Sequence, residues 1–81
     1  MADVSPDKVA KLISEGAIRP LDELKAAAVA KHPGATVTDS ELADEYGRYI
    51  FKVELRDQQN VEWTVDVDAK TGEILKDEQG N

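Results

Sequence analysis

The sequence predicts an α+β domain in which one long and one short N-terminal helix pack on one face of a three- to four-stranded antiparallel β-meander. The first observation is an alternation of apolar and polar residues over 49–56 and again over 61–68, which is typical of half-buried strands. The second is the polar segment 57–60 between these runs, which suits a hairpin loop in which Asn60 adopts a left-handed conformation. The third is the helical spacing of apolar residues before Pro33.

The short helix is predicted over residues 5–15. Ser5 is a preferred N-cap residue, and Pro6 suits the first helical position. Gly16 is expected to end the helix, because glycine readily adopts the conformation of a C-terminal cap. The apolar residues between these limits recur at helical spacing: Val9, Leu12 and Ile13.

The long helix is predicted from Pro20 to His32, directly before Pro33-Gly34. Acidic residues fall in its first turn and basic residues in its last turn, in agreement with the helix dipole. One stripe of the helix is apolar and one flank is rich in alanine, so this helix can lie close to the apolar face of a sheet. The stripe consists of Leu21, Leu24 and Ala28.

Cross-strand charges predict the register of the central hairpin. Leu55 is expected opposite Trp63, because a slip by two residues would set Glu54 against Glu62. Opposite charges across a strand pair stabilise it by roughly 0.2 to 1 kcal/mol, and like charges destabilise it similarly. The further expected pairs are Phe51 with Val67, Val53 with Val65, Lys52 with Asp66, and Arg56 with Glu62.

One further strand is expected on each side of this hairpin. Val37 and Leu42 differ in parity within residues 35–45, which predicts a β-bulge or one residue that faces the helix edge. After the hairpin, a turn with Gly72 at positive φ is expected to lead into a short last strand over 73–76.

A single domain is expected over residues 1–81, with its core in 20–76 and a frayed polar tail over 77–81. The net charge of −7 disfavours a nucleic-acid or anionic-membrane partner. The chain has no cysteine, and no apolar run approaches the ~18 residues of a membrane span. Residues 1–3 are unlike the start of a signal peptide, so we expect either a cytoplasmic protein or one whose leader was removed.

The residue inventory argues against an enzyme. His32 is the only histidine, and its place at a helix C-terminus favours a capping role over a catalytic base. Ser5, Ser14 and Ser40 have no second histidine to activate them. Isolated glycines form no phosphate-binding loop. We therefore assign no catalytic, cofactor-binding or metal-ligating residue, and we expect no cofactor.

Three other features have a structural and a functional interpretation. Asp66 and Asp68 resemble the start of a calcium loop, but Lys70 stands where a third oxygen ligand belongs, which favours a solvated turn. Trp63 and Tyr49 can form a ligand platform, although both have core parity and packing is favoured. The third feature is an apolar residue with outer-face parity, which together with a nearby aromatic residue can mark a contact patch: Ile50 and Tyr46.

The motif order resembles the PepSY domain family. A helix closes in His32-Pro33-Gly34, a strand reads Tyr49-Ile50-Phe51-Lys52-Val53-Glu54-Leu55, and the end reads Val67-Asp68-Ala69-Lys70-Thr71-Gly72-Glu73-Ile74-Leu75. Phe51 stands where the family often has tyrosine, and Ile74 replaces the usual valine. The resemblance covers about residues 21–76, and residues 13–21 look like the lead-in of small secreted bacterial PepSY proteins.

This resemblance implies a binding or regulatory module with no catalytic residues, periplasmic or secreted, related to the propeptides of thermolysin-type metallopeptidases. The expected partner is a protein, such as a peptidase, that adds a strand to a sheet edge. The same edges allow a monomer or a weak homodimer. The alternative function is a sensory or accessory domain of an envelope signalling system that binds a small ligand or a cation through its acidic face.

Overall fold

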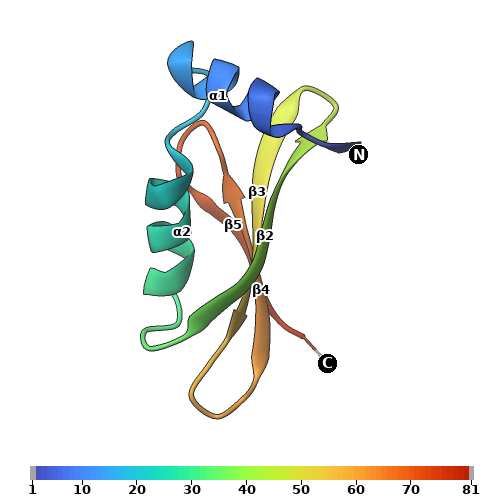
Figure 1. The fold of residues 1–81 in the computed structure, drawn as a ribbon. Coiled ribbons are helices and arrows are strands. Elements are labelled where there is room, and N and C mark those ends of the chain that lie inside the picture. Colours follow the sequence, from blue (N-terminus) through green and yellow to red (C-terminus); the bar gives the residue numbers. More distant parts are fainter. Residues whose placement is uncertain (1, 81) are drawn as a thin grey trace.

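The computed structural model describes residues 2–80, and Met1 and Asn81 lie outside the described residues. Within that range the fold is α+β, with two helices and one five-stranded antiparallel sheet of order β1-β2-β3-β4-β5 (Figure 1). The elements follow one another as β1 (Ala2–Asp3), α1 (Pro6–Ser14), α2 (Leu21–Ala30), β2 (Thr36–Glu45), β3 (Arg48–Arg56), β4 (Glu62–Asp68) and β5 (Ile74–Gln79).

The α+β class is confirmed, and three details of the prediction are wrong. The sheet has five strands among residues 2–80, because β1 is a two-residue strand too short to show a period. The helices have nearly equal length, 9 residues in α1 and 10 in α2, since α2 ends before His32. Residues 77–79 are not frayed, because they pair with Trp63, Thr64 and Val65 of β4.

The register of the central hairpin is as predicted. Leu55 pairs with Trp63, and every other expected pair between β3 and β4 is present. Asn60 has φ of 67°, as the loop requires. The predicted bulge in β2 is also confirmed, because the pairing with β3 shifts between Val37 and Asp39. This shift lets Val37 and Leu42 both pack against the core despite their opposite parity.

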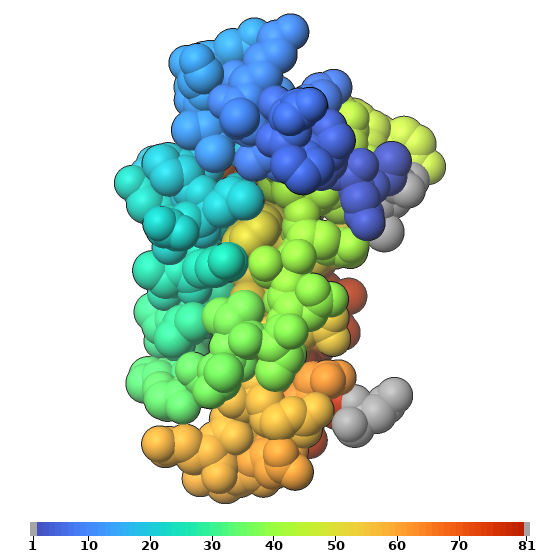
Figure 2. Space-filling view, in the orientation of Figure 1, coloured from blue at the N-terminus to red at the C-terminus, as the bar shows by residue number. Residues whose placement is uncertain are grey.

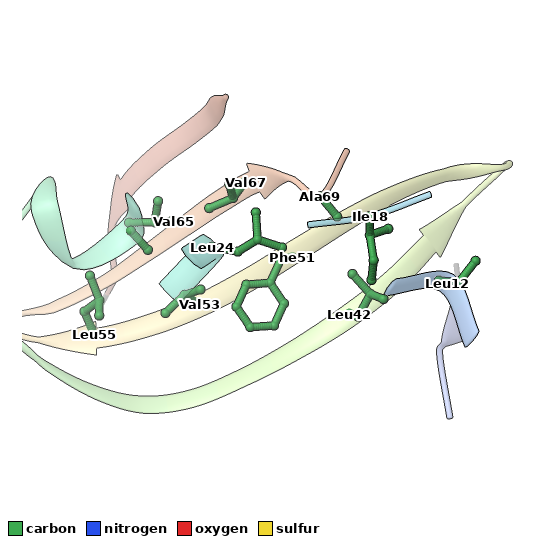
Figure 3. Packing of buried hydrophobic residues seen from close by; sticks show 11 residues of the cluster. Leu12, Ile18, Leu24, Leu42, Phe51, Val53, Leu55, Val65, Val67 and Ala69 are labelled. Carbon is green, nitrogen blue, oxygen red and sulfur yellow. The ribbon is translucent and has the colours of Figure 1, made fainter. Parts of the chain in front are cut away.

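The core lies between α2 and the inner face of the sheet (Figure 3). Leu24 and Ala28 of the predicted stripe are fully buried, and Leu21 is half-buried. Phe51 is the largest fully buried side chain. Helix α1 lies across one end of the sheet (Figure 1) and contributes Leu12 to the same core, with its N-cap Ser5 accepting a hydrogen bond from the Lys8 N–H.

The outer face of the sheet is not uniformly open to water. Ile50, which was expected to be exposed, is only 4% exposed. It pairs with Ala43 on one side and Asp68 on the other, and Arg48, two residues before it on β3, forms an ion pair with Asp68 at 3.1 Å. Long charged side chains often cover apolar surface with their stems. Ile50 is therefore buried on the outer face, outside the main core cluster, and cannot belong to a contact patch.

Candidate functional site

His32 links the end of α2 to the edge strand β5. Its Nε2 atom lies 2.7 Å from Asp77 Oδ1, and the two side chains are 15% and 25% exposed. The imidazole also stacks on Trp63, with ring centroids 4.2 Å apart and planes 28° apart. Its partners are a carboxylate and an indole, not a serine, so this arrangement is a tie between secondary-structure elements. Sequence analysis missed it because Asp77 was placed in a frayed tail.

Trp63 is half-buried on the core side of the sheet and packs against the core, as its parity predicts. Its indole Nε1–H donates to Asp57 Oδ2 at 2.9 Å. The other oxygen of Asp57 accepts from the backbone N–H groups of Gln59 and Val61, each at 2.9 Å. The hydrogen bond from Trp63, followed by the one from Val61, lowers the pKa of Asp57. This carboxylate therefore organises the whole β3–β4 loop.

The outer face carries the predicted pair of Lys52 with Asp66, at 3.8 Å, and a pair that was not predicted, between Lys52 Nζ and Glu45 at 3.0 Å. Arg56 and Glu62 pair at 3.4 Å. The Asp66 Oδ1 atom is buried and has no hydrogen-bond partner among residues 2–80. No group of three or more metal-ligating side chains occurs in this described range.

Asp68 stabilises the turn that follows β4. Its Oδ1 accepts from the Lys70 and Thr71 N–H groups at 2.9 and 3.2 Å, and its Oδ2 lies 3.1 Å from Arg48 Nη2. Burial would raise the pKa of Asp68, but these hydrogen bonds outweigh it and lower the pKa. Gly72 has φ of 81°, as expected. Both oxygens of Asp68 are thus already used within the fold.

The tip of the β2–β3 hairpin carries a fully exposed aromatic side chain. Tyr46 is 100% exposed, and its φ of 59° places it in the left-handed region. Gly47 follows with φ of 85°, and its N–H donates to Asp44 Oδ1 at 2.8 Å. Asparagine followed by glycine is the preferred pair for such a turn. A tyrosine here is unfavourable for the backbone and buries no surface, so its side chain is available to a partner.

Comparison with known proteins identifies relatives of part of the chain. The family model PepSY, described as "Peptidase propeptide and YPEB domain", matches residues 20–78. The uncharacterized protein YkoJ of Bacillus subtilis (strain 168) is 40% identical over 48 residues, which is 59% of this chain. The aligned part covers only 28% of the length of YkoJ. No solved structure matches the chain. Neither helix within residues 2–80 is long and apolar enough to cross a membrane.

Proposed function

The chain belongs to the PepSY family, and from this premise we propose that it is a non-catalytic module that binds a peptidase and restrains it outside the cytoplasm. The family description supports a propeptide-like regulatory or binding role. Inhibition by this chain is an extension by analogy with propeptides.

The observation that carries the proposal is Tyr46. Tyrosine is enriched among the residues that dominate protein–protein binding energy, because its ring buries a large area at a small entropy loss. Here the ring is fully exposed on a left-handed residue, so the fold itself gains nothing from tyrosine at this position. We assign Tyr46 as the anchor of the interface with the peptidase.

The experiment is a pull-down from the secreted proteins of the source organism with the full chain as bait. Tyr46→Asn is the test variant, because asparagine suits the left-handed turn and leaves the fold intact. Glu78→Gln, a change at an exposed residue of β5 far along the chain, is the control. Capture of a metallopeptidase by the wild type and the control, with loss by Tyr46→Asn, supports the proposal. Capture of no peptidase by any bait contradicts it.

We also propose that residues 1–81 form one domain, whose core extends beyond the residues 20–76 expected from the sequence. What supports this is the buried cluster, in which Leu12 and Ile18 pack with Leu24 and Phe51. Leu12 and Ile18 precede residues 20–78, the part of the chain that the family model matches. Removal of residues 2–19 should therefore expose core side chains of the matched part and lower the melting temperature.

A second candidate is a sensory role in which the acidic outer face binds a cation. It is favoured by the Asp66 Oδ1 atom, which is buried without a hydrogen-bond partner in the described range. A bound cation stabilises the folded state by mass action. If this role is real, calcium should raise the melting temperature of the wild type and not that of Asp66→Asn. An equal response of both proteins would eliminate it.

A further inference from the structure

A second surface, the α1–β2 groove, lies between α1, the first turn of α2 and β2. Figure 2 shows it as a hollow between the blue, cyan and green parts of the chain, with yellow atoms of β3 at its base. Its volume is about 480 Å³, within the range of roughly 300 to 1,000 Å³ that is usual for ligand-binding pockets. Most of its lining is apolar: Val4, Val9, Ile13, Leu21, Leu42 and Phe51.

The floor of the groove is preformed by the core. Leu42 and Phe51 are 5% and 1% exposed, so their positions are set by packing. The walls are only half-buried, because Val9, Ile13 and Leu21 leave part of their surface open to water. An apolar side chain that enters the groove would remove this surface from water without a rearrangement of the fold.

Two acidic residues, Asp3 and Glu41, form the rim of the groove. They belong to the outer face of the sheet, whereas the floor residue Leu42 belongs to the inner face. Leu42 faces the helices, whereas its neighbour Glu41 pairs with Lys52 on the outer face. Asp3 stands beside it, opposite Ala43. Successive residues of an extended chain point to opposite sides. A segment laid along this edge therefore presents alternate side chains to the apolar groove and to the two carboxylates.

The N-terminal segment covers the edge of β2 only from Leu42 to Asp44 among residues 2–80. There β1 pairs with Ala43 and Asp44, and the Val4 N–H donates to the Leu42 carbonyl at 2.9 Å before the chain enters α1. The Ser40 N–H is already bonded to Asp39 Oδ1 at 2.9 Å. Because this backbone donor is occupied, side-chain contacts rather than strand addition would provide most of the binding energy.

The charges of the rim decide which kind of segment fits. The pKa of Glu41 is raised, first by its side-chain contact with the Asp3 carboxyl, then by burial and by charge repulsion from Asp3, and these effects outweigh the opposing effect of Lys52 on the next strand. A basic side chain placed here would relieve this repulsion. A second copy of the chain is disfavoured, because the net charge is −7 and the two rims would repel each other.

We propose that the α1–β2 groove binds an extended segment of a partner polypeptide in which apolar and basic side chains alternate. The apolar side chains enter the groove, and the lysine or arginine side chains lie against Asp3 and Glu41. This surface is distinct from the Tyr46 tip. Two of its elements, β1 and α1, precede residue 20, where the family match begins. The inference therefore stands independently of peptidase regulation.

The test measures fluorescence anisotropy of labelled, capped pentapeptides with the full chain at low salt. The probe is Lys-Val-Lys-Val-Lys, and the controls are Glu-Val-Glu-Val-Glu and Lys-Ser-Lys-Ser-Lys. The proposal predicts saturable binding of the probe and at least about 10-fold weaker binding of either control, since both the charge and the apolar contact are needed. Absence of saturable binding by the probe overturns the proposal.

Protein variants locate the binding on the chain. Asp3→Asn/Glu41→Gln should weaken binding of the probe by about 3- to 10-fold, because two partly exposed ion pairs are lost. Glu15→Gln/Glu73→Gln removes the same charge at exposed positions outside the groove and should have no effect. Equal weakening by both double variants would show nonspecific attraction and refute the proposal.

A steric variant separates the groove from its rim. Ala10 is an exposed residue of α1 that lines the groove, so Ala10→Phe should narrow the groove without disturbing the core. It should abolish binding of the probe while its melting curve remains that of a folded protein. A wild-type dimer in sedimentation that Ala10→Phe converts to monomer would instead assign the groove to a second copy, and would contradict the proposal.

Discussion

Replacement of Tyr46 by asparagine should stabilise the fold and weaken binding at the same time. A left-handed backbone is unfavourable by about 1 to 2 kcal/mol for a residue with a bulky Cβ substituent, and Tyr46 has φ of 59°. Asparagine tolerates this conformation far better. Since the tyrosine is 100% exposed, no buried surface is lost with it. We expect a net gain of about 0.5 to 1 kcal/mol in the free energy of unfolding.

For a chain of this size that gain corresponds to a rise of roughly 2 to 8 °C in melting temperature. Thermal unfolding followed by circular dichroism measures it, with Gly47→Ala as the opposite control. Gly47 has φ of 85°, so an alanine there should lower the melting temperature. If Tyr46→Asn lowered the melting temperature, Tyr46 would contribute to the fold, and its assignment as a free anchor would be wrong.

Three further variants test the ties and the core of the fold. His32→Ala should lower the free energy of unfolding by about 1 to 2 kcal/mol, because the contact with Asp77 and the stacking on Trp63 are both lost. Chemical denaturation measures this free energy, and an unchanged value would show that these contacts do not stabilise the fold. Asp57 has a lowered pKa, so its contribution to stability is complete above the ordinary aspartate pKa and is lost as the pH falls through the folded-state pKa. Asp57→Asn should therefore flatten the acid limb of a plot of melting temperature against pH, and an unchanged limb would contradict this. Ile50→Asp should destabilise the protein by about 3 to 5 kcal/mol, since a carboxylate would replace a side chain that is 4% exposed. A variant as stable as the wild type would show that residue 50 is exposed to solvent.

The central hairpin was predictable because local pattern and pairwise charge agree there. Alternation assigned the faces of β3 and β4, and the contrast between paired and opposed charges selected one register. The turn residues Asn60 and Gly72 were predictable for a related reason, since each must adopt a positive φ. These features depend only on neighbours along one strand or across one pair.

The features that sequence analysis missed depend on contacts between distant segments. Strand β1 has two residues and no period of its own, so only its pairing with Ala43 and Asp44 defines it. The contact of His32 with Asp77 joins residues 45 positions apart. Ile50 is buried because neighbouring side chains cover it. Its position in the alternation of β3 indicates only the face of the sheet on which it lies.

The candidate binding surfaces likewise combine features that the sequence shows with features that only the fold shows. Tyr46 could be noted from the sequence as an aromatic residue beside a turn, but its complete exposure and its left-handed backbone are properties of the folded hairpin. The α1–β2 groove requires α1 to lie across the end of the sheet, which no local pattern specifies. Its acidic rim likewise arises only when β1 places Asp3 beside β2.

The measurement that tests the central claim most directly is an inhibition titration. A secreted metallopeptidase of the source organism, freed of its own propeptide, is assayed with a fluorogenic peptide at increasing concentrations of this chain. We expect loss of activity at micromolar concentrations of the wild type. About 30-fold more of the Tyr46→Asn variant should be needed, as for the loss of a hot-spot residue worth about 2 kcal/mol. Full activity of every such peptidase, or equal inhibition by both proteins, would contradict it.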